Sequence, residues 1–527
     1  MGFARVYSRA LLGVDSPQVL VEVHISNGLP SLTIVGLPEA SVKESRERVR
    51  SALLNAGFDM PVQRITVNLA PADLPKSGGR YDLAIAVGIL IASNQISLPD
   101  GLNGDGSLET FEFFSELALN GNSRAIAGVL PSLLSAQAAG RISVVAWDNA
   151  EEVALLQQAW QQIHHMGENS YRPVIVAKDL NAVATALSTD TPDVFTSQEF
   201  SAVDYVPTLC LSDIRGQRQA KRVLELCASG GHSLLMVGEP GAGKTMLASR
   251  LPGILPKMLP EQALETAAIH SIAGRPRDLE HFFERPFLQP HHTASAVSLI
   301  GGGSNPKPGA ISLAHNGVLF LDELPEFSRP VLEALREPLE NRKVEISRVR
   351  QQACFPASFQ LVVALNPSPS GYFPDDRKGR CKDTPNEINR YLKKISGPLL
   401  DRIDCHLEVP AVDVSELQRA DNVEGAEAET SLDVRARVEV CQARQIERQG
   451  CLNAFLENKQ LQSLNLDETS MQLLKVATEE LGLSARAYYR TLRLAQTLAD
   501  MESTEIQAMH VAEALSYRPS QRFLELV

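Results

Sequence analysis

The most constraining feature of this 527-residue chain is the segment SLLMVGEPGAGKTML at residues 233–247. An apolar run at 234–237 leads into the pattern G-x-x-x-x-G-K-T, and a helical pattern follows at 246–251. This order predicts a phosphate-binding loop between a buried strand and a helix, because backbone N–H groups around the glycines and at the helix start attract phosphate. A chance glycine turn need not have the strand, the Lys-Thr pair and the helix together.

Each residue of this loop has an expected part in binding a nucleotide. Lys244 is expected to contact the β- and γ-phosphates of ATP, and the Thr245 hydroxyl is expected to bind Mg²⁺. The glycines allow the backbone to close around the phosphates. The residues expected to bind ATP are Gly238, Glu239, Pro240, Gly241, Ala242, Gly243, Lys244, Thr245 and Met246.

A second acidic anchor follows in the segment GVLFLDELPEF at residues 317–327. Val318–Leu321 reads as a buried strand, and ligands bind at the carboxyl ends of strands in open α/β sheets. We therefore expect Asp322 to bind Mg²⁺ and Glu323 to act as the general base on the attacking water. The alternative is a solvated acidic turn. Asn366, which follows another apolar strand at 361–365, is a candidate sensor of the γ-phosphate, although an Asn-Pro pair alone is usually a turn.

Composition and charge limit the classes of protein to which the chain can belong. Forty-four per cent hydrophobic residues suffice for a large core, and a net charge of −13 disfavours a protein that coats nucleic acid over its whole surface. A local basic channel remains compatible with that charge. Seven scattered cysteines, no apolar signal segment and no run of about 18 apolar residues lead us to expect a cytoplasmic protein with no membrane association.

Pattern changes along the chain divide it into five parts. The first is an α+β domain, the third alternates strands with helices in the manner of a parallel sheet, and the last is helical. The expected boundaries are 1–185 for the first domain, 186–205 for a linker, 206–410 for the ATPase core, 411–431 for an acidic connection and 432–527 for the helical domain.

The order of loop, Asp-Glu pair and Asn resembles the AAA+ ATPases, and longer phrases resemble the magnesium-chelatase-like ComM/YifB family. The phrases are NLAPADLPKSGGRYDLAIA (68–86), QPHHTASAVSLIGGGSNPKPGAISLAHNGVLFLDELPEF (289–327), SGPLLDRIDCHLEVP (396–410) and GLSARAYYRTLRLAQTLAD (482–500). The resemblance implies an α/β fold: an AAA+ P-loop core, a non-proteolytic N-terminal domain of the α+β type that Lon and ribosomal protein S5 share, and a C-terminal helical lid. It also implies a ring, usually a hexamer.

The resemblance suggests roles for arginines outside the loop. Arg402, in the DRID of 401–404, resembles an arginine finger that reaches the neighbouring subunit's γ-phosphate. The alternative is a structural salt bridge. Arg486 resembles the lid arginine called sensor 2, and because Arg490 and Arg493 follow one and two helical turns later, the choice among the three stays open.

The chain departs from the family at a possible metal site. Relatives commonly carry cysteines in an NPCPCG segment followed by a further cysteine pair, whereas residues 366–371 here read NPSPSG and only Cys381 follows. Hydroxyls are poor Zn²⁺ ligands, so we predict no structural zinc. The adjacent His291 and His292 lack partners at finger spacing and are not expected to bind a metal.

The leading functional hypothesis is an ATP-dependent DNA motor, a helicase or branch-migration ATPase that acts in recombination during natural transformation, with recombination proteins as possible partners. Arg348 and Arg350, on a strand predicted at 344–350 and paired near 357–360, and Lys307, in a glycine-rich insertion at 299–311, would contact DNA phosphates in the ring pore without reading sequence. The alternatives are a solvated strand face and a plain glycine turn.

Two other functions are alternatives to the DNA motor. A magnesium-chelatase-type subunit that drives metal insertion or protein remodelling has a similar ATPase core, but the N-terminal domain favours the DNA motor. A Lon-type protease needs a Ser nucleophile with a Lys base. Ser77 stands in the corresponding region without the flanking pattern, and the helix predicted at 129–139 has no Lys, so proteolysis is not expected.

Overall fold

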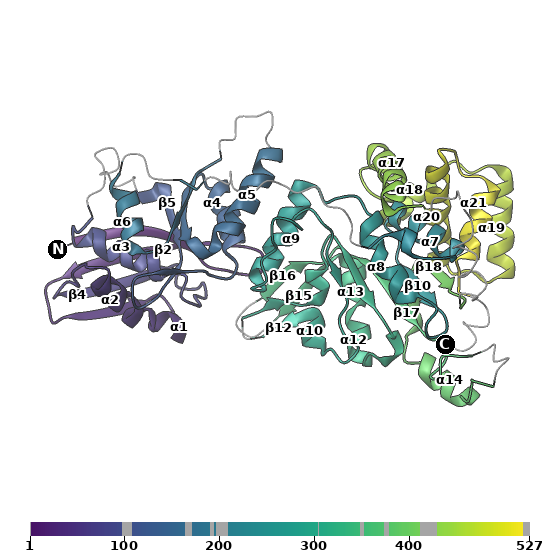
Figure 1. Cartoon of the computed structure of the whole chain (residues 1–527), viewed down its shortest axis with the longest axis horizontal. Helices are drawn as coiled ribbons and strands as arrows, with labels where there is room; N and C mark the ends of the chain where they lie inside the picture. The colour runs from purple at the N-terminus through teal and green to yellow at the C-terminus, as the bar shows by residue number, and fades with distance from the viewer. Residues whose placement is uncertain are drawn as a thin grey trace.

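The structure is a computed structural model of the whole chain, and it describes residues 2–96, 108–163, 171–189, 194–195, 209–303, 305–347, 352–373, 379–411 and 429–519. The fold is mixed α/β. A domain with a mixed sheet stands at the N-terminal end, an AAA-like core with a parallel sheet lies in the middle, and helices form the C-terminal region (Figure 1). Within those ranges no helix is long and apolar enough to cross a membrane.

The N-terminal domain is built on seven strands in the order β3-β4-β2-β1-β5-β8-β9. Strand β2 pairs antiparallel with β1 and with β4. The other neighbours pair parallel: β3 with β4, β1 with β5, β5 with β8 and β8 with β9. The strands are β1 (Gly2–Arg9), β2 (Gln18–Ser26), β3 (Ser31–Val35), β4 (Arg64–Ala70), β5 (Phe111–Phe114), β8 (Ile142–Ala146) and β9 (Val174–Ala177). The helices are α1 (Ala40–Lys43), α2 (Ser45–Asn55), α3 (Asp82–Ala92), α4 (Val129–Ala138), α5 (Ala150–Ile163) and α6 (Leu180–Ser188).

The core has a five-stranded sheet in the order β11-β14-β17-β10-β18, and every pair in it is parallel, as the alternation of strands and helices predicted. Its strands are short and almost wholly apolar, as is typical of a parallel sheet covered on both faces. They are β11 (Phe287–Leu288), β14 (Val318–Leu321), β17 (Gln360–Leu365), β10 (Leu234–Val237) and β18 (Cys405–Glu408). The helices are α7 (Arg218–Gly230), α8 (Lys244–Ile254), α9 (Pro260–Ile272), α10 (Ala296–Ile300), α11 (Ala310–Leu313), α12 (Arg329–Ala334), α13 (Arg336–Asn341), α14 (Pro385–Leu392) and α15 (Gly397–Leu400).

Two hairpins are inserted among these elements. In the first, β12 (Gly301–Gly302) pairs with β13 (Lys307–Pro308), and in the second, β15 (Lys343–Ser347) pairs with β16 (Gln352–Pro356). The partner strand therefore precedes 357–360, the segment expected from the sequence, because residues 354–356 are themselves part of the ladder. Arg348 and Arg350 fall between β15 and β16, outside the described residues.

The C-terminal region is helical, as the period of its apolar residues predicted. Its helices pack on α7 and on one end of the core sheet, and the two regions share one hydrophobic cluster in which Val438, Leu494 and Leu498 meet Leu224 and Leu234. The helices are α17 (Ser431–Gln449), α18 (Asn458–Gln462), α19 (Glu468–Glu480), α20 (Ala485–Glu502) and α21 (Ala508–Ser516).

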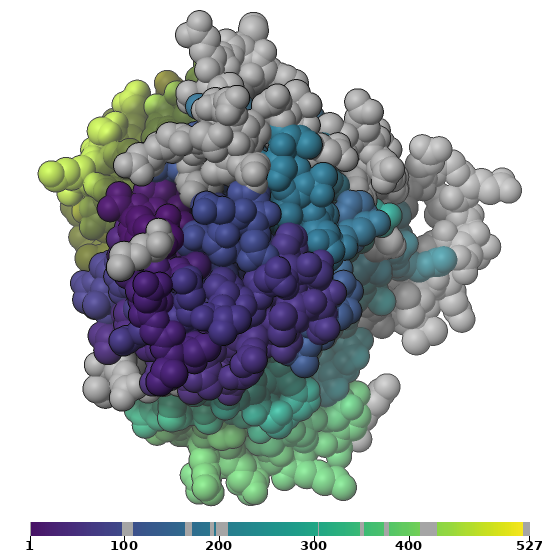
Figure 2. Space-filling view, turned by 90° about the vertical axis from the view of Figure 1, so that its left-hand side faces the viewer, coloured from purple at the N-terminus to yellow at the C-terminus, as the bar shows by residue number. Residues whose placement is uncertain are grey.

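The N-terminal domain and the core also share a hydrophobic cluster. Helices α4 and α5 pack against α9 of the core, and the Gly128 N–H donates to the Ser271 carbonyl at 3.0 Å across the junction. Seen from its own end, the N-terminal domain lies in front of the core (Figure 2). The cluster combines Phe114, Val129, Leu130, Leu133, Val145, Leu155, Leu156 and Val174 with Met258, Ala263, Leu264, Ala267 and Phe282.

The shared cluster predicts that the two regions unfold together. Phe282 belongs to the core and is fully buried, so Phe282→Ala is expected to lower the free energy of unfolding by about 3–5 kcal/mol through lost contacts and a cavity. The chain's two tryptophans, Trp147 and Trp160, lie in the N-terminal domain, so their fluorescence during urea denaturation reports on that domain. Phe3→Ala is the control, because Phe3 is 54% exposed. An unchanged fluorescence midpoint in Phe282→Ala would show that the domain unfolds independently.

Candidate active site

The phosphate-binding loop lies at the carboxyl edge of the core sheet, directly after β10. Gly241 and Gly243 have positive φ angles of 80° and 90°, and open space surrounds both, so the loop can curve around an anion. Helix α8 begins at Lys244 and directs its free N–H groups toward the loop. Gly238 packs so tightly that a Cβ there would lie 2.3 Å from the Val409 carbonyl oxygen. Met246 is half exposed on the first turn of α8.

The Lys244 ammonium is held inside the loop by three acceptors. It donates to the carbonyls of Gly238 and Glu239 at 2.6 and 3.0 Å and to the Asn366 Oδ1 at 2.9 Å. Burial lowers the pKa of Lys244, and the carboxylates of Asp322 and Glu323 raise it in part. Asn366 follows β17, the direct neighbour of β10, so the parallel pairing brings the candidate sensor and the loop lysine together.

Thr245 and Asp322 also meet at this edge. The Thr245 hydroxyl donates to the Asp322 Oδ2 at 2.8 Å, and the Glu323 N–H donates to the Asp322 Oδ1 at 3.0 Å. A hydroxyl and a carboxylate are oxygen ligands of the kind that Mg²⁺ prefers beside nucleotide phosphates. The donor set at this edge therefore fits Mg²⁺ with ATP.

Glu323 has an unusual conformation and a partner that sequence patterns did not predict. Its φ of 53° is in the left-handed region, which is sparsely populated for side chains other than Gly, Asn and Asp. Its Oε2 lies 3.3 Å from the His292 Nδ1, while the His291 ring contacts the Thr293 hydroxyl at 2.8 Å. His292 therefore faces the candidate general base. The sequence pattern of the His291-His292 pair suggests only a metal site, and it gives no sign of this contact.

The residues after Asn366 fold against the outer side of the loop. The Ser370 N–H donates to the Asp383 Oδ2 at 2.8 Å, the Ser370 hydroxyl donates to the same oxygen, and the Ser368 hydroxyl lies 3.2 Å from that of Ser370. Burial raises the pKa of Asp383, but the serine hydrogen bonds hold it below its usual value. A Cβ on Gly371 would meet the Pro240 ring at 2.5 Å. The serines of the NPSPSG segment thus bind a carboxylate.

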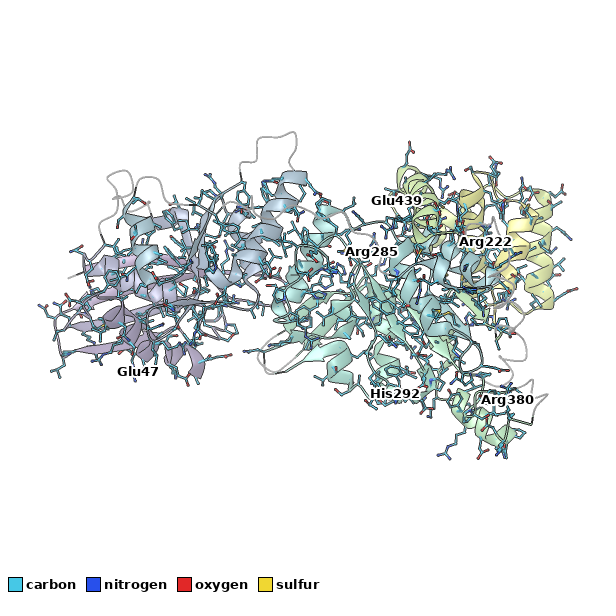
Figure 3. All side chains as sticks on the ribbon, viewed as in Figure 1. Glu47, Arg222, Arg285, His292, Arg380 and Glu439 are labelled. Atoms are coloured by element: carbon cyan, nitrogen blue, oxygen red, sulfur yellow. The ribbon has the colours of Figure 1, made fainter. Side chains whose placement is uncertain are left out.

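This segment brings a cation to the loop. The Arg380 guanidinium lies 3.1 Å from the Glu239 carboxylate and 4.1 Å above the Tyr372 ring. Glu239 would otherwise place an uncompensated negative charge on a loop that binds phosphate. In Figure 3, Arg380 and His292 lie on the same lower side of the core, away from Arg222 near the C-terminal helices. No sequence motif pointed to Arg380, because its position depends on how the segment folds back.

Arg402 and Arg486 lie at the opposite edge of the sheet. Arg402 precedes β18, and the neighbouring Asp404 accepts from the Ser233 N–H at 2.9 Å, at the start of β10. The four residues of β10 separate this edge from the loop by roughly 13 Å at about 3.3 Å per residue. Both arginines bind the Glu340 carboxylate, Arg402 through a short contact and Arg486 at 3.1 Å. Neither lies beside the loop of its own chain.

The arginines that follow Arg486 in α20 bind backbone carbonyls. Arg490 is buried and donates to the Ile403 carbonyl at 2.7 Å, and Arg493 donates to the Leu456 carbonyl at 2.7 Å. Arg486 is 48% exposed at its side chain. Among the three, Arg486 therefore has the most accessible guanidinium.

Comparisons with known proteins show which family the chain belongs to. Family models described as magnesium chelatase subunit ChlI match residues 210–417, 21–149 and, for the C-terminal part, 428–518. The competence protein ComM of Haemophilus influenzae is 46% identical over 531 residues, which cover 100% of this chain and 99% of that protein. The chain belongs to the ComM/YifB family.

Other ComM/YifB relatives match over nearly the whole chain. The uncharacterized protein YifB of Escherichia coli is 45% identical over 530 residues, 99% of this chain and 98% of its own length. The uncharacterized protein Rv2897c of Mycobacterium tuberculosis is 38% identical over 528 residues, 98% of this chain and 99% of its own length. The family carries magnesium-chelatase domains and is an ATPase family, which implies ATP and Mg²⁺ as ligands.

The contact between Arg380 and Glu239 predicts a charge effect on ATP binding. Arg380→Ala is expected to raise the Kd for a fluorescent ATP analogue about fivefold, on the order of 1 kcal/mol for a partly exposed pair, because the Glu239 charge then repels phosphate. Glu239→Gln in the same chain should restore the affinity. Arg390→Ala, an exposed cation on α14, is the control. A double variant that binds as weakly as Arg380→Ala would refute the charge explanation.

Proposed function

We propose that the protein is an ATP-dependent DNA motor, a helicase or branch-migration ATPase that works as a hexameric ring during recombination in natural transformation. The single observation that best supports DNA as the partner is the pair of adjacent hairpins in the core. A Cβ on Gly301 of β12 would lie 3.0 Å from the Ile346 Cδ1 of β15, so the two insertions form one unit. The name of the Haemophilus influenzae relative, competence protein ComM, agrees with this process.

The hairpins have the features of a surface that grips a phosphate backbone. Lys307 on β13 is exposed, and Arg348 and Arg350 lie in the sequence between β15 and β16, outside the described residues. Cations on insertions bind phosphates without reading bases, because they contact the charge that all sequences share. We infer that these three residues contact a single strand or a branched junction in the pore.

The site residues divide the work of hydrolysis. Lys244 and the loop N–H groups bind the phosphates, Thr245 and Asp322 hold Mg²⁺, and Asn366 orients the attacking water. Glu323 takes the proton from that water. Mg²⁺, when bound with ATP, neutralises charge on the phosphate oxygens. Arg402 and Arg486 act on the ATP of the neighbouring subunit, since they lie at the far edge of their own sheet.

The N-terminal domain is proposed to have the Lon/ribosomal-S5-like fold without proteolytic activity. The Lys76 ammonium donates to the Gly36 and Pro71 carbonyls, and α4 carries no lysine. Ser77 lines a cavity of 310 Å³ at the junction with the core, together with Arg80, Glu116 and Lys307. The domain is therefore a scaffold that borders the first hairpin.

A second candidate is a magnesium-chelatase-type subunit, because the matching family models carry that description. The two functions differ in what accelerates ATP hydrolysis. The test is the steady-state ATPase rate of the full chain with and without single-stranded or forked DNA, with Lys244→Ala as the inactive reference. A DNA motor is expected to hydrolyse ATP several times faster with DNA, whereas no acceleration by any DNA would favour the chelatase function.

If the three hairpin cations contact DNA, the DNA-stimulated increase in ATPase rate should depend on them. A triple variant with Lys307→Ala, Arg348→Ala and Arg350→Ala is expected to lose most of the DNA-stimulated increment. The slope of log K against log salt for single-stranded DNA, measured by fluorescence anisotropy, should fall by about 2 because each phosphate contact contributes roughly 0.7. Lys475→Ala, an exposed lysine on α19 in the C-terminal region, is the control. An unchanged salt slope in the triple variant would remove the hairpins from the DNA path.

A further inference from the structure

Glu340, at the end of α13, connects the two arginines assigned to the neighbouring subunit's ATP. The Arg402 and Arg486 guanidinium groups both donate from Nη2 to the same oxygen, Glu340 Oε1. They come from different parts of the chain, Arg402 from the turn before β18 and Arg486 from the first turn of α20. One carboxylate oxygen therefore bridges the core and the C-terminal helices.

The three residues line a cavity of 610 Å³ at the edge opposite the phosphate-binding loop. Arg342, Arg490 and Arg493 also line it, but Arg342 lies 3.7 Å over the Phe455 ring and the other two donate to backbone carbonyls. Of the acidic residues that line it, Asp404 accepts from the Ser233 N–H. Glu340 is thus the carboxylate that Arg402 and Arg486 share.

This arrangement has the chemistry of a phosphate site. Two guanidinium groups that converge on one carboxylate oxygen can converge equally on a phosphate oxygen, and phosphate, with more charge and more acceptor atoms, is the stronger partner. We propose that Glu340 stands in for the γ-phosphate of ATP bound to a second copy of this chain: it occupies Arg402 and Arg486 until the neighbour brings ATP, which displaces it. The proposal rests on the shared ATP site proposed above.

The different exposure of the three side chains favours such an exchange of partners. Arg402 is only 11% exposed, so its guanidinium keeps its place when its partner changes. Glu340 is 46% and Arg486 is 48% exposed, and ion pairs at that exposure contribute little to stability. A carboxylate held this weakly can turn away into solvent, while the arginines stay aligned at the cavity.

The decisive variant is Glu340→Gln, which removes the charge and keeps the size of the side chain. If Glu340 competes with phosphate, the ATP concentration at half-maximal rate is expected to fall about fivefold, within the range of intramolecular couplings, with kcat not lowered. The protein concentration needed for half-maximal ATPase should fall as well. Glu337→Gln, one turn earlier on α13 and exposed, is the matched control and should behave as the unchanged chain.

Two further variants separate the possible failures. Glu340→Asp keeps the charge and should return the half-maximal ATP concentration toward that of the unchanged chain. A lower kcat or a higher half-maximal ATP concentration in Glu340→Gln would mean that Glu340 prepares the arginines for ATP instead of competing with it. No change in either quantity would mean that Glu340 does neither. Both results overturn the proposal. Full ATPase activity in Arg402→Ala would instead overturn the shared ATP site itself.

Discussion

Parallel pairing of β14, β17 and β10 is the constraint on which the rest of the structure depends. In a parallel sheet all carboxyl ends meet at one edge, so the phosphate-binding loop, Asp322 and Asn366 lie together although more than 120 residues separate the first from the last. The same geometry sends the segment before β18, with Arg402, to the other edge. A single subunit of this topology therefore has the candidate phosphate-binding groups on one side and arginines on the other, as the proposed ATP site shared between subunits requires.

Acidic partners accompany the arginines at both edges. Glu239 binds Arg380 beside the loop, and Glu340 binds Arg402 and Arg486 at the far edge. These pairs are partly exposed, and such pairs are individually weak. In a chain of net charge −13 they keep the arginines neutralised in the free subunit. On the proposals above, these carboxylates also influence when the arginines become available to phosphate.

The sequence predicted those features whose signals are local. The parallel core sheet, the helical C-terminal region and the family followed from apolar periods and from near-continuous motifs, and the structure and the comparisons confirm them. The contacts of His292, Arg380 and Glu340 could not be predicted, because each joins residues that lie apart along the chain and no motif signals the pairing. The cluster that fuses the N-terminal domain to the core was missed for the same reason: α4, α5 and α9 each look like ordinary amphipathic or apolar helices until they are packed together.

The central claim is that each ATP site combines Lys244 of one subunit with Arg402 of the next. The most direct measurement is the ATPase rate of an equimolar mixture of Lys244→Ala and Arg402→Ala proteins, each inactive alone. In mixed rings about a quarter of the interfaces pair an intact Lys244 with an intact Arg402, since a closed ring of identical subunits repeats one heterologous interface. The account predicts recovery of about a quarter of the rate of the unchanged protein. A mixture no more active than its separate components would contradict it.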